Sequence, residues 1–473
     1  MKGRAADAEA AAALPLHPSS MHRLLPTARF ALAALVAAFV VTLGVLALTR
    51  GGSQPNPGAG PQAGAPFARS ASGVTLDGSA REATTTDGRI AALSAAVRVR
   101  PGDTAAAAAL AGAYLQRARE TADPKNYLQA NDVLERALAL RPGDPAALSA
   151  RGGLRLARHD FAGALADARS VLASQGGVRP YGVLVDALAE LGRYDEATDA
   201  VQNMLDRKPN IESYARGSYV RELRGDLPGA VQAMRLAVAA GGAVPENEAY
   251  VASLVGDLEF TRGRLAAAAA AYRDSLRRFP GFSRAEAGLA RVDAARGRPG
   301  RAIDRLRRLV ARLPAAPALV ELGELELAVG QSSRARRHLA LAAEQNRLEL
   351  EAGVKPDAIF IVQEIDHGDP RRALRLAREA WTGAPSVRSA DAVGWALTRA
   401  GRPKAGLRWA RRALRLGSRD PNFLFHAGMA ARAAGDDARA RRWLGRLLEQ
   451  TPRFSALRAP QARRALAASQ ARS

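Results

Sequence analysis

The chain of 473 residues contains no cysteine. Disulfide bonds and thiolate metal sites are therefore excluded, and cysteine usage does not decide the redox compartment. Lysine is also scarce, because only five of the 69 basic residues are lysines and the others are arginines. Aromatic residues make up only 5% of the chain, whereas alanine is abundant. This composition is expected where helices pack closely through small side chains.

Acidic residues are fewer than basic ones. The 46 Asp and Glu against 69 Lys and Arg give a formal net charge of +23. Such a charge can indicate nucleic acid or an anionic surface as a partner. A bias toward arginine, together with many alanines and glycines, is also typical of the solvent-exposed faces of proteins encoded by GC-rich genomes. The charge alone leaves both interpretations open.

Motifs that carry catalysis are missing as well. The six histidines form no His-x-x-x-His or His-Glu pair, and the chain has neither a serine nucleophile elbow nor a phosphate-binding loop. We therefore predict that the protein is not an enzyme and that it binds no cofactor and no metal. The histidines are His17, His22, His159, His338, His367 and His426.

One long apolar stretch is present near the N-terminus. Residues 30–48 carry no charge and would span about 28 Å as a helix, close to the hydrocarbon core of a bilayer. We predict a transmembrane helix over residues 30–49 after a short N-terminal tail (1–29), with a cleaved signal peptide or a buried helix as alternatives. Basic residues are more numerous before the span than just after it, which predicts a cell-membrane protein with a cytoplasmic N-terminus and an extracytoplasmic remainder. Residues 50–86 are rich in Gly and Pro and are expected to form a flexible linker.

A small residue, usually alanine, recurs at a spacing of 33 or 34 residues, with two longer gaps of 38. A glycine recurs five residues before it. Apolar side chains lie at steps of three and four on both sides of each glycine, which fits helices and not strands. A period of this length indicates stacked two-helix repeats. The small positions are Ala130, Ala164, Ala197, Ala230, Ala268, Ala302, Ala335, Ala373, Gly406 and Ala440, and the glycines are Gly192, Gly225, Gly263, Gly297, Gly330, Gly368, Gly401 and Gly435.

Each recurring residue has an expected structural role. The small residue should lie where the two helices of a hairpin cross most closely. The glycine should end the first helix, since it adopts a left-handed backbone at little cost. The two gaps of 38 are expected to reflect wider turns near Gly241–Glu246 and Arg347–Pro356.

The pattern resembles the tetratricopeptide repeat (TPR). The Gly-x-Tyr-x-x-Ala turn of that family stands at Gly192–Ala197, and its Leu-Gly pair is matched by Val255-Gly256 and Leu322-Gly323. The resemblance implies an all-α fold, a right-handed α-α superhelix. We expect a TPR array over residues 87–455, made of a half repeat and about ten two-helix units, and a C-terminal capping helix over residues 456–473.

The resemblance also implies a non-catalytic scaffold that binds a protein or peptide segment in a concave groove lined by the first helices. We expect it to be membrane-tethered and to act in cell-envelope assembly or biogenesis; a cytoplasm-facing adaptor that recruits a soluble partner is the alternative. An RNA-binding helical repeat needs a regular period that presents one base per unit, so nucleic acid is not expected. The residues predicted to bind the partner in the groove are Tyr250, Asp257, Arg284, Arg291, Glu324, Arg388, Asp391, Trp395, Arg399, Phe425, Met429 and Arg432.

Arginines concentrate on the expected second helices of the C-terminal half. Their spacing places them largely on the outward back of the array. Such a stripe can contact anionic surfaces weakly, through attraction that salt screens, or it can keep alanine-rich helices soluble. These residues are Arg305, Arg307, Arg308, Arg336, Arg337, Arg375, Arg378, Arg411, Arg412, Arg415, Arg441, Arg442 and Arg446.

Overall fold

The computed structural model of the protein describes residues 85–175, 180–242 and 244–471. Within these ranges the chain forms 22 α-helices, α3 to α24, and no strand. The prediction of an all-α fold is therefore confirmed for this part of the chain.

The predicted membrane segment is not part of what the structure describes. The tail (1–29), the transmembrane helix (30–49) and all but the last two residues of the linker (50–86) lie outside the described ranges. Of the helices that are described, none combines the length and the apolar character needed to cross a membrane.

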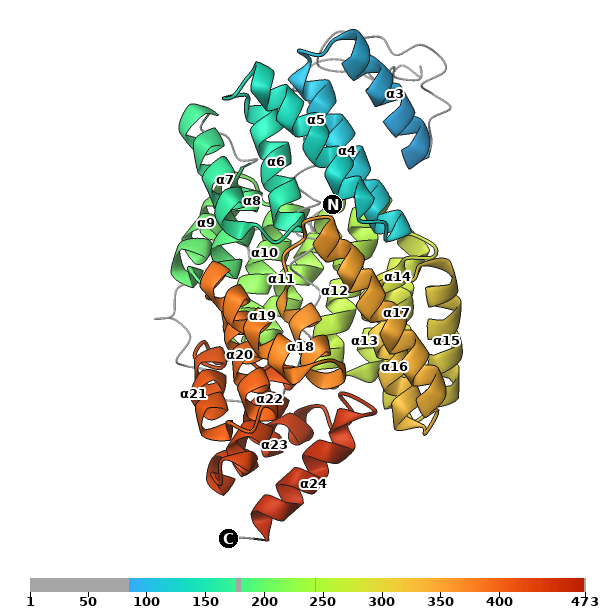
Figure 1. Cartoon of the computed structure of the whole chain (residues 1–473), viewed down its shortest axis with the longest axis vertical. Helices are drawn as coiled ribbons and strands as arrows, with labels where there is room; N and C mark the ends of the chain where they lie inside the picture. The colour runs from blue at the N-terminus through green and yellow to red at the C-terminus, as the bar shows by residue number, and fades with distance from the viewer. Residues whose placement is uncertain (1–84, 176–179, 243, 472–473) are drawn as a thin grey trace, which may run out of the picture.

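The described helices run as one single helix, ten successive pairs and one final helix (Figure 1). Each pair is a unit with a first and a second helix. The two helices of a unit pack together, and each second helix except α17 packs on the helix that follows it. The single helix is α3 (Thr86–Val99) and the final one is α24 (Arg458–Gln470). The units are α4 (Thr104–Thr121) with α5 (Lys125–Leu140), α6 (Pro145–Ala157) with α7 (Phe161–Gln175), α8 (Tyr181–Glu190) with α9 (Tyr194–Arg207), α10 (Ile211–Leu223) with α11 (Leu227–Ala240), α12 (Pro245–Thr261) with α13 (Leu265–Arg278), α14 (Ser283–Ala295) with α15 (Pro299–Arg312), α16 (Ala316–Ala328) with α17 (Ser332–Glu351), α18 (Ala358–His367) with α19 (Pro370–Gly383), α20 (Val387–Arg399) with α21 (Pro403–Ala413), and α22 (Pro421–Ala433) with α23 (Asp437–Gln450).

The recurring small residue lies in the closest contact between the helices of a unit. All the alanines of the series are completely buried. Gly406 takes this place in α21, and a Cβ added there would lie 2.2 Å from Thr398 Oγ1 and 2.7 Å from the Gly394 carbonyl oxygen of α20. A larger side chain would push the two helices apart, as the sequence predicted.

The recurring glycine ends most first helices in the left-handed conformation. Its φ is +70° at Gly263 and +77° at Gly225, and it is positive at five of the other six positions. Gly368 is the exception, with φ of −116°. In the second unit His159 occupies the equivalent place with φ of 57°, so the left-handed turn persists there without glycine.

The first predicted wider turn is wrong, because the inserted residues extend a helix. The loop 241–244 has the same length as the loop 279–282 of the next unit, and the extra residues lengthen α12 to 17 residues against 13 in α14. At the second gap α17 has 20 residues against 14 in α15, and the turn after it is also wider, since the loop 352–357 has six residues against three in 313–315. Continuing a helix gives each added residue a backbone hydrogen bond, which a longer loop would not.

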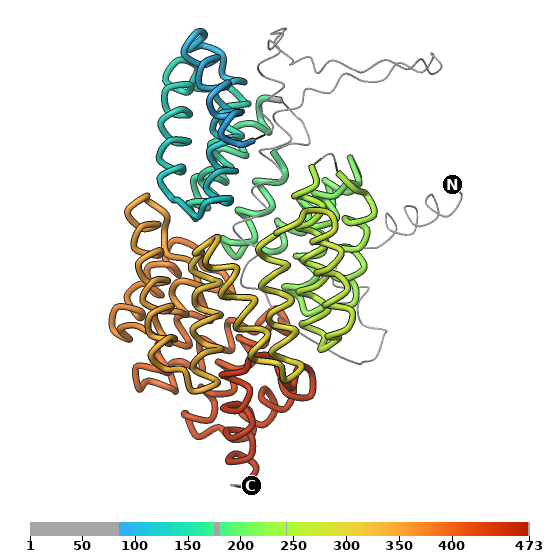
Figure 2. The backbone as a smooth tube through the Cα atoms, turned by 90° about the vertical axis from the view of Figure 1, so that its right-hand side faces the viewer, coloured from blue at the N-terminus to red at the C-terminus, as the bar shows by residue number. Residues whose placement is uncertain are grey.

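The array coils so tightly that the turn inside one unit touches the start of the unit six places further along (Figure 2). The Val387 amide donates a hydrogen bond to the Tyr194 hydroxyl oxygen at 2.7 Å. In the same way Thr451 Oγ1 donates to the Thr261 carbonyl oxygen at 3.0 Å. These contacts join residues about 190 positions apart and stack one superhelical turn on the next.

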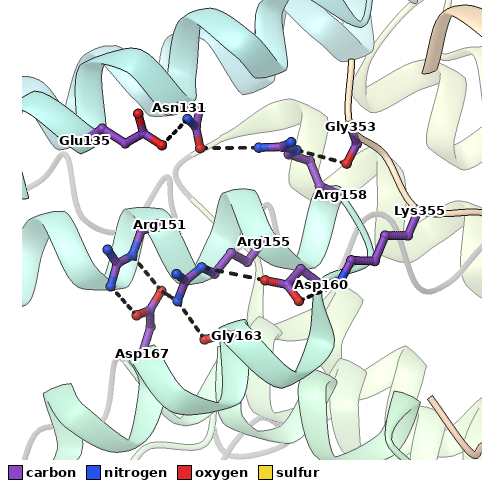
Figure 3. A network of polar contacts seen from close by, with 10 residues as sticks. All are labelled: Asn131, Glu135, Arg151, Arg155, Arg158, Asp160, Gly163, Asp167, Gly353 and Lys355. Atoms are coloured by element: carbon purple, nitrogen blue, oxygen red, sulfur yellow. Dashed lines mark hydrogen bonds and ion pairs between the residues drawn. The ribbon is translucent and has the colours of Figure 1, made fainter. Parts of the chain in front are cut away.

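A polar network makes the same contact for the second unit (Figure 3). The guanidinium of Arg158 donates to Asn131 Oδ1 of α5 and to the Gly353 carbonyl oxygen, both at 3.2 Å. Lys355 Nζ lies 2.8 Å from Asp160 Oδ1, and the Lys355 amide donates to the Arg158 carbonyl oxygen at 3.0 Å. The segment before α18 is thereby fixed to the turn between α6 and α7.

The largest hydrophobic cluster spans both superhelical turns. It joins residues of α6 to α14 with Val387, Ala390, Ala413 and Phe423 from the C-terminal units. Helix α12 lies deep within this arrangement, since nearly all of its residues are buried. The coil therefore has a shared core, and the inner faces of the first helices are largely covered.

Candidate binding cavity at the inner face

The tight coil leaves a cavity of about 240 Å³ at the inner face, here called the axial cavity. Its wall comes from α12, α14, α16, α18, α20 and α22 and from residues 453–458, which precede and begin α24. Apolar side chains such as Val362, Phe423 and Phe454 alternate with charged ones. First helices of six successive units thus converge on one space.

A second cavity of about 380 Å³ adjoins the axial cavity. The two share Ala358, Ile359 and Arg388 as lining residues. The second cavity extends toward the turn between α6 and α7, where His159 and Phe161 line it. Together the two cavities follow the seam between the superhelical turns.

Asp257 of α12 is the centre of one buried charge network. Its carboxylate lies 2.6 Å from an Arg291 Nη atom. It also accepts two hydrogen bonds from Arg284, of which the one from Nε is 2.9 Å long. The Tyr272 hydroxyl donates to the same carboxylate at 2.6 Å. The two arginines come from α14, so this network ties the first helices of adjacent units around one buried carboxylate.

Arg458 is the centre of a second network in the wall of the axial cavity. Its guanidinium lies 2.5 Å from Glu324 Oε1 of α16 and 2.9 Å from Asp366 Oδ2 of α18. Asp366 also accepts a hydrogen bond from Trp395 Nε1 at 2.9 Å. Burial raises the pKa of Asp366, but the charges of Arg458 and His426 and the hydrogen bonds from Trp395 and Arg458 together outweigh it, so the pKa is lowered. The carboxylate therefore stays ionised and holds the Trp395 ring in place.

Arg388 of α20 joins the two superhelical turns. Its guanidinium donates to the Tyr219 hydroxyl oxygen at 3.0 and 3.2 Å, and Tyr219 donates in turn to Glu190 Oε1 at 2.8 Å. Burial raises the pKa of Tyr219, so the phenol remains protonated. The Arg388 side chain also lines both cavities.

His426 of α22 and Asp391 of α20 form a buried pair in the wall of the axial cavity. His426 Nδ1 lies 2.8 Å from Asp391 Oδ2. The His426 ring stacks on Trp395, with ring centroids 4.5 Å apart and an angle of 13° between the planes. The opposite atoms, His426 Nε2 and Asp391 Oδ1, are buried and have no hydrogen-bond partner among the described residues.

Several carboxyl groups around the cavity are destabilised in their charged form. Burial, reinforced by the Asp391 carboxylate, raises the pKa of Asp420. Burial also raises the pKa of Glu321 to about 7 and that of Glu222 to about 8, in spite of the Arg291 and Arg388 charges respectively. Burial is the main cause of all three shifts.

The structure brings some of the predicted groove residues together. Arg291, Glu324, Arg388 and Asp391 line the axial cavity. Asp257 and Arg284 lie in the network beside it.

Other predicted groove residues do not form an open surface. Tyr250, Trp395 and Phe425 are buried, with at most 4% of each residue exposed, because the first helices close on one another. Arg399 is exposed and lies over the Trp395 ring, 5.6 Å from its centroid. Met429 packs on the C-terminal core, and Arg432 Nε lies 3.9 Å from Asp437 Oδ1.

Sequence reasoning missed Glu321, Asp420, His426 and Arg458. The pair His426–Asp391 had a usable signal, since its 35-residue separation is about one repeat and adjacent first helices lie side by side. Arg458 had none, because it reaches the cavity only through the turn before α24. In the described part of the chain, no three His, Asp or Glu side chains are grouped so as to hold a metal ion.

The arginines of the predicted back are mostly exposed. Ten of the thirteen are exposed, and Arg305, Arg307 and Arg441 are half-buried. The first two of these pair with acidic residues: Arg305 lies 3.7 Å from Asp293 and Arg307 lies 2.8 Å from Glu326.

Comparison with known proteins gives fold-level similarity only. No family model and no curated protein matches the chain. Similar solved structures include the human IFIT1 dimer with PPP-AAAA (14% identity, 67% of this chain and 72% of that chain, TM-score 0.42). Others are yeast Tom70 (14%, 82% and 92%, TM-score 0.33) and a tetratricopeptide repeat protein from Parabacteroides merdae (15%, 55% and 98%, TM-score 0.32). With identities this low and TM-scores below 0.5, these similarities carry no argument about what this chain binds.

Proposed function

We propose that this chain is a non-catalytic scaffold whose helical units hold a segment of a partner protein at their inner face. The observation that carries the proposal is the axial cavity, on which the first helices of six successive units converge. A concave space with an apolar wall and a few convergent polar groups is the usual form of a binding site. Its continuation past Arg388 into the second cavity suits an extended segment.

The proposal includes attachment of this scaffold to a membrane by the predicted transmembrane helix (30–49). It would tether the units to the cell membrane on the extracytoplasmic side, where they would serve envelope assembly or biogenesis. The alternative of a cytoplasm-facing adaptor uses the same cavity with the opposite orientation. The exposed arginines of the back would add a weak attraction to anionic surfaces, which salt screens.

Site-specific photo-crosslinking tests the proposal. A photoreactive phenylalanine analogue replaces Ile359, which lines both cavities, and, as the control, Leu341, which is exposed on α17. We expect a crosslinked protein from position 359 only. Filling the cavity with Ala294→Trp should abolish the product, because Ala294 lines the axial cavity.

The same experiment separates the parts of the proposal. Equal crosslinking at both positions, or a product that survives Ala294→Trp, would argue against binding at the inner face. The tether predicts that the crosslinked product sediments with membranes. Recovery of the product in the soluble fraction would contradict the tether and leave the scaffold intact.

A further inference from the structure

Two residues that line the axial cavity each have one buried polar atom without a hydrogen-bond partner among the described residues. Asp391 is 3% exposed and His426 is 1% exposed, and both line this cavity. Their mutual bond, from His426 Nδ1 to Asp391 Oδ2, leaves His426 Nε2 and Asp391 Oδ1 with no hydrogen bond in the described structure. A buried polar atom left unpaired costs about 1–3 kcal/mol, so a ligand that pairs with both atoms would be stabilised here.

The chemistry of this pair decides what kind of group fits. An ionised carboxylate can only accept, so His426 Nδ1 carries a hydrogen and donates to Asp391. In the neutral ring Nε2 is then an acceptor. With the ring neutral, both unpaired atoms are acceptors, and a group that satisfies them must donate at least two hydrogen bonds. The stacked Trp395 ring, itself bonded to Asp366, fixes the direction of Nε2.

The charge around the pair favours a cation. Two of the nearby arginines form ion pairs with other carboxylates, Arg458 with Glu324 and Asp366, and Arg291 with Asp257. Arg388 donates to Tyr219, and its charge also acts on Asp420. The carboxylate of Asp420, which also lines the cavity, accepts a hydrogen bond from the Asn422 backbone amide. Asp391 and Asp420 thus place two carboxyl groups at one end of the cavity.

The shape of the site selects among cations. Asp391 offers only Oδ1, because Oδ2 is held by His426, so the site lacks the two parallel oxygens that a guanidinium prefers. An ammonium group is a compact charge with three donors on a flexible aliphatic stem. Phe423, Phe454 and Val362 supply an apolar wall for such a stem. A space of about 240 Å³ is smaller than a typical small-molecule site and suits one side chain.

We propose that the axial cavity binds the ammonium group of a lysyl side chain carried by the bound segment, with Asp391, His426 and Asp420 as its acceptors. The inference rests on the proposed function, because the lysine belongs to the segment that the scaffold holds. Arg453 and Ala456 line the cavity and are exposed, which indicates that the lysyl stem enters beside the turn before α24. Trp395, predicted from sequence as a groove residue, would act as a positioning residue behind His426.

Calorimetric titration of the full chain tests this site. The probes are Nα-acetyl-lysine methylamide and Nα-acetyl-norleucine methylamide, which share a four-carbon stem and differ at its end by the ammonium group. We expect the lysine compound to bind at least tenfold more tightly. Equal binding of the two, or no binding of the lysine compound, would overturn the inference. Binding of n-butylamine without binding of the lysine compound would also overturn it, since a free amine would then be the ligand.

Two variants connect the binding to the named acceptors. Asp391→Asn and Asp420→Asn each remove one charge with little change of shape, and asparagine keeps the N-cap role of residue 420. We expect each to weaken binding of the lysine compound at least tenfold, whereas Asp195→Asn, on the exposed side of α9, should leave it unchanged. Unchanged binding in a variant that melts like the parent would refute the site.

Failure of this inference can be told apart from failure of the proposed function. A crosslinked partner at position 359 without preference for the lysine compound would refute the lysine site and leave the scaffold. Preferential binding of the lysine compound without any crosslinked partner would refute the scaffold.

Discussion

The recurring glycine illustrates how one residue type serves two purposes in this chain. At Gly225 the backbone is left-handed, with φ of +77°, and a Cβ would also lie 2.3 Å from the Gly417 carbonyl oxygen of the next superhelical turn. Gly192 and Gly263 make the same close approach, to Pro385 and Gln450. At Gly297 the conformation is the same, with φ of +76°, but no atom lies within 4 Å of the added Cβ. Where the superhelical turns stack, glycine is needed both for its left-handed backbone and for the close approach. Where they do not stack, only the left-handed backbone requires it.

Alanine substitution separates these two needs. Gly297→Ala should cost about 1 kcal/mol of unfolding free energy, the penalty of a left-handed conformation for a residue with a Cβ. Gly225→Ala should cost about 1–3 kcal/mol more, because the Cβ would also force the Gly417 segment away. Denaturant unfolding of both variants measures the difference. Equal losses would show that the stacked turns do not press on one another.

Helix packing shows a related use of small residues at the scale of elements. The Tyr272 ring of α13 lies between Gly256 of α12 and Gly288 of α14, where an added Cβ would be 2.5 and 2.4 Å from the ring atom Cε1. The family-like pair Val255-Gly256 therefore makes room for this ring. Tyr272 also bonds Asp257, so three helices meet at one aromatic side chain. The sequence showed the glycines, but not which side chain they accommodate.

Glycines inside helices should respond to alanine in opposite directions. Gly288→Ala should destabilise the protein by about 1–3 kcal/mol, because the added methyl group overlaps the Tyr272 ring. Gly445→Ala should stabilise it by about 0.5–1 kcal/mol, because Gly445 lies within α23 with no atom within 4 Å of the added Cβ and alanine favours a helix. Thermal unfolding of the two variants distinguishes these signs. A gain from Gly288→Ala would refute the tight α13–α14 packing.

The whole molecule is held by contacts between superhelical turns, and some of them bury charge. Glu222 on α10 and Asp420 before α22 line one small pocket with Arg388. Burial is the main reason that the pKa of Glu222 is raised to about 8, and the Asp420 carboxylate adds to this shift. Ionisation of Glu222 therefore works against the stacking of the fourth unit on the tenth.

This arrangement makes stability depend on pH. A carboxyl group whose pKa is higher in the folded than in the unfolded protein favours folding below about pH 4.5, and this contribution is lost as the pH rises through about 8. Glu222→Gln removes the loss, so the variant should exceed the parent in unfolding free energy by about 2 kcal/mol at pH 9. This value is less than the full shift would give, because the side chain is only half-buried.

Urea unfolding at pH 5 and pH 9 provides the measurement. At pH 5 the two proteins should be nearly equal in stability. The exposed Glu135→Gln is the control for replacing a carboxylate by an amide. A stabilisation by Glu222→Gln of the same size at both pH values would contradict the buried, protonated Glu222.

The sequence by itself determined the helical units of this protein. The period of the small residue and its glycine specifies a helix, a left-handed turn and a second helix, because these are contacts between residues close in the chain. Ala268 and Gly263 therefore have the positions that the sequence predicted. The tertiary structure decided how the units coil. Small rotations between neighbouring units add up over six units, and their total cannot be predicted from the sequence pattern of a single unit. That sum brings Thr451 to Thr261, encloses the axial cavity and buries Trp395, which the sequence had placed on an open groove.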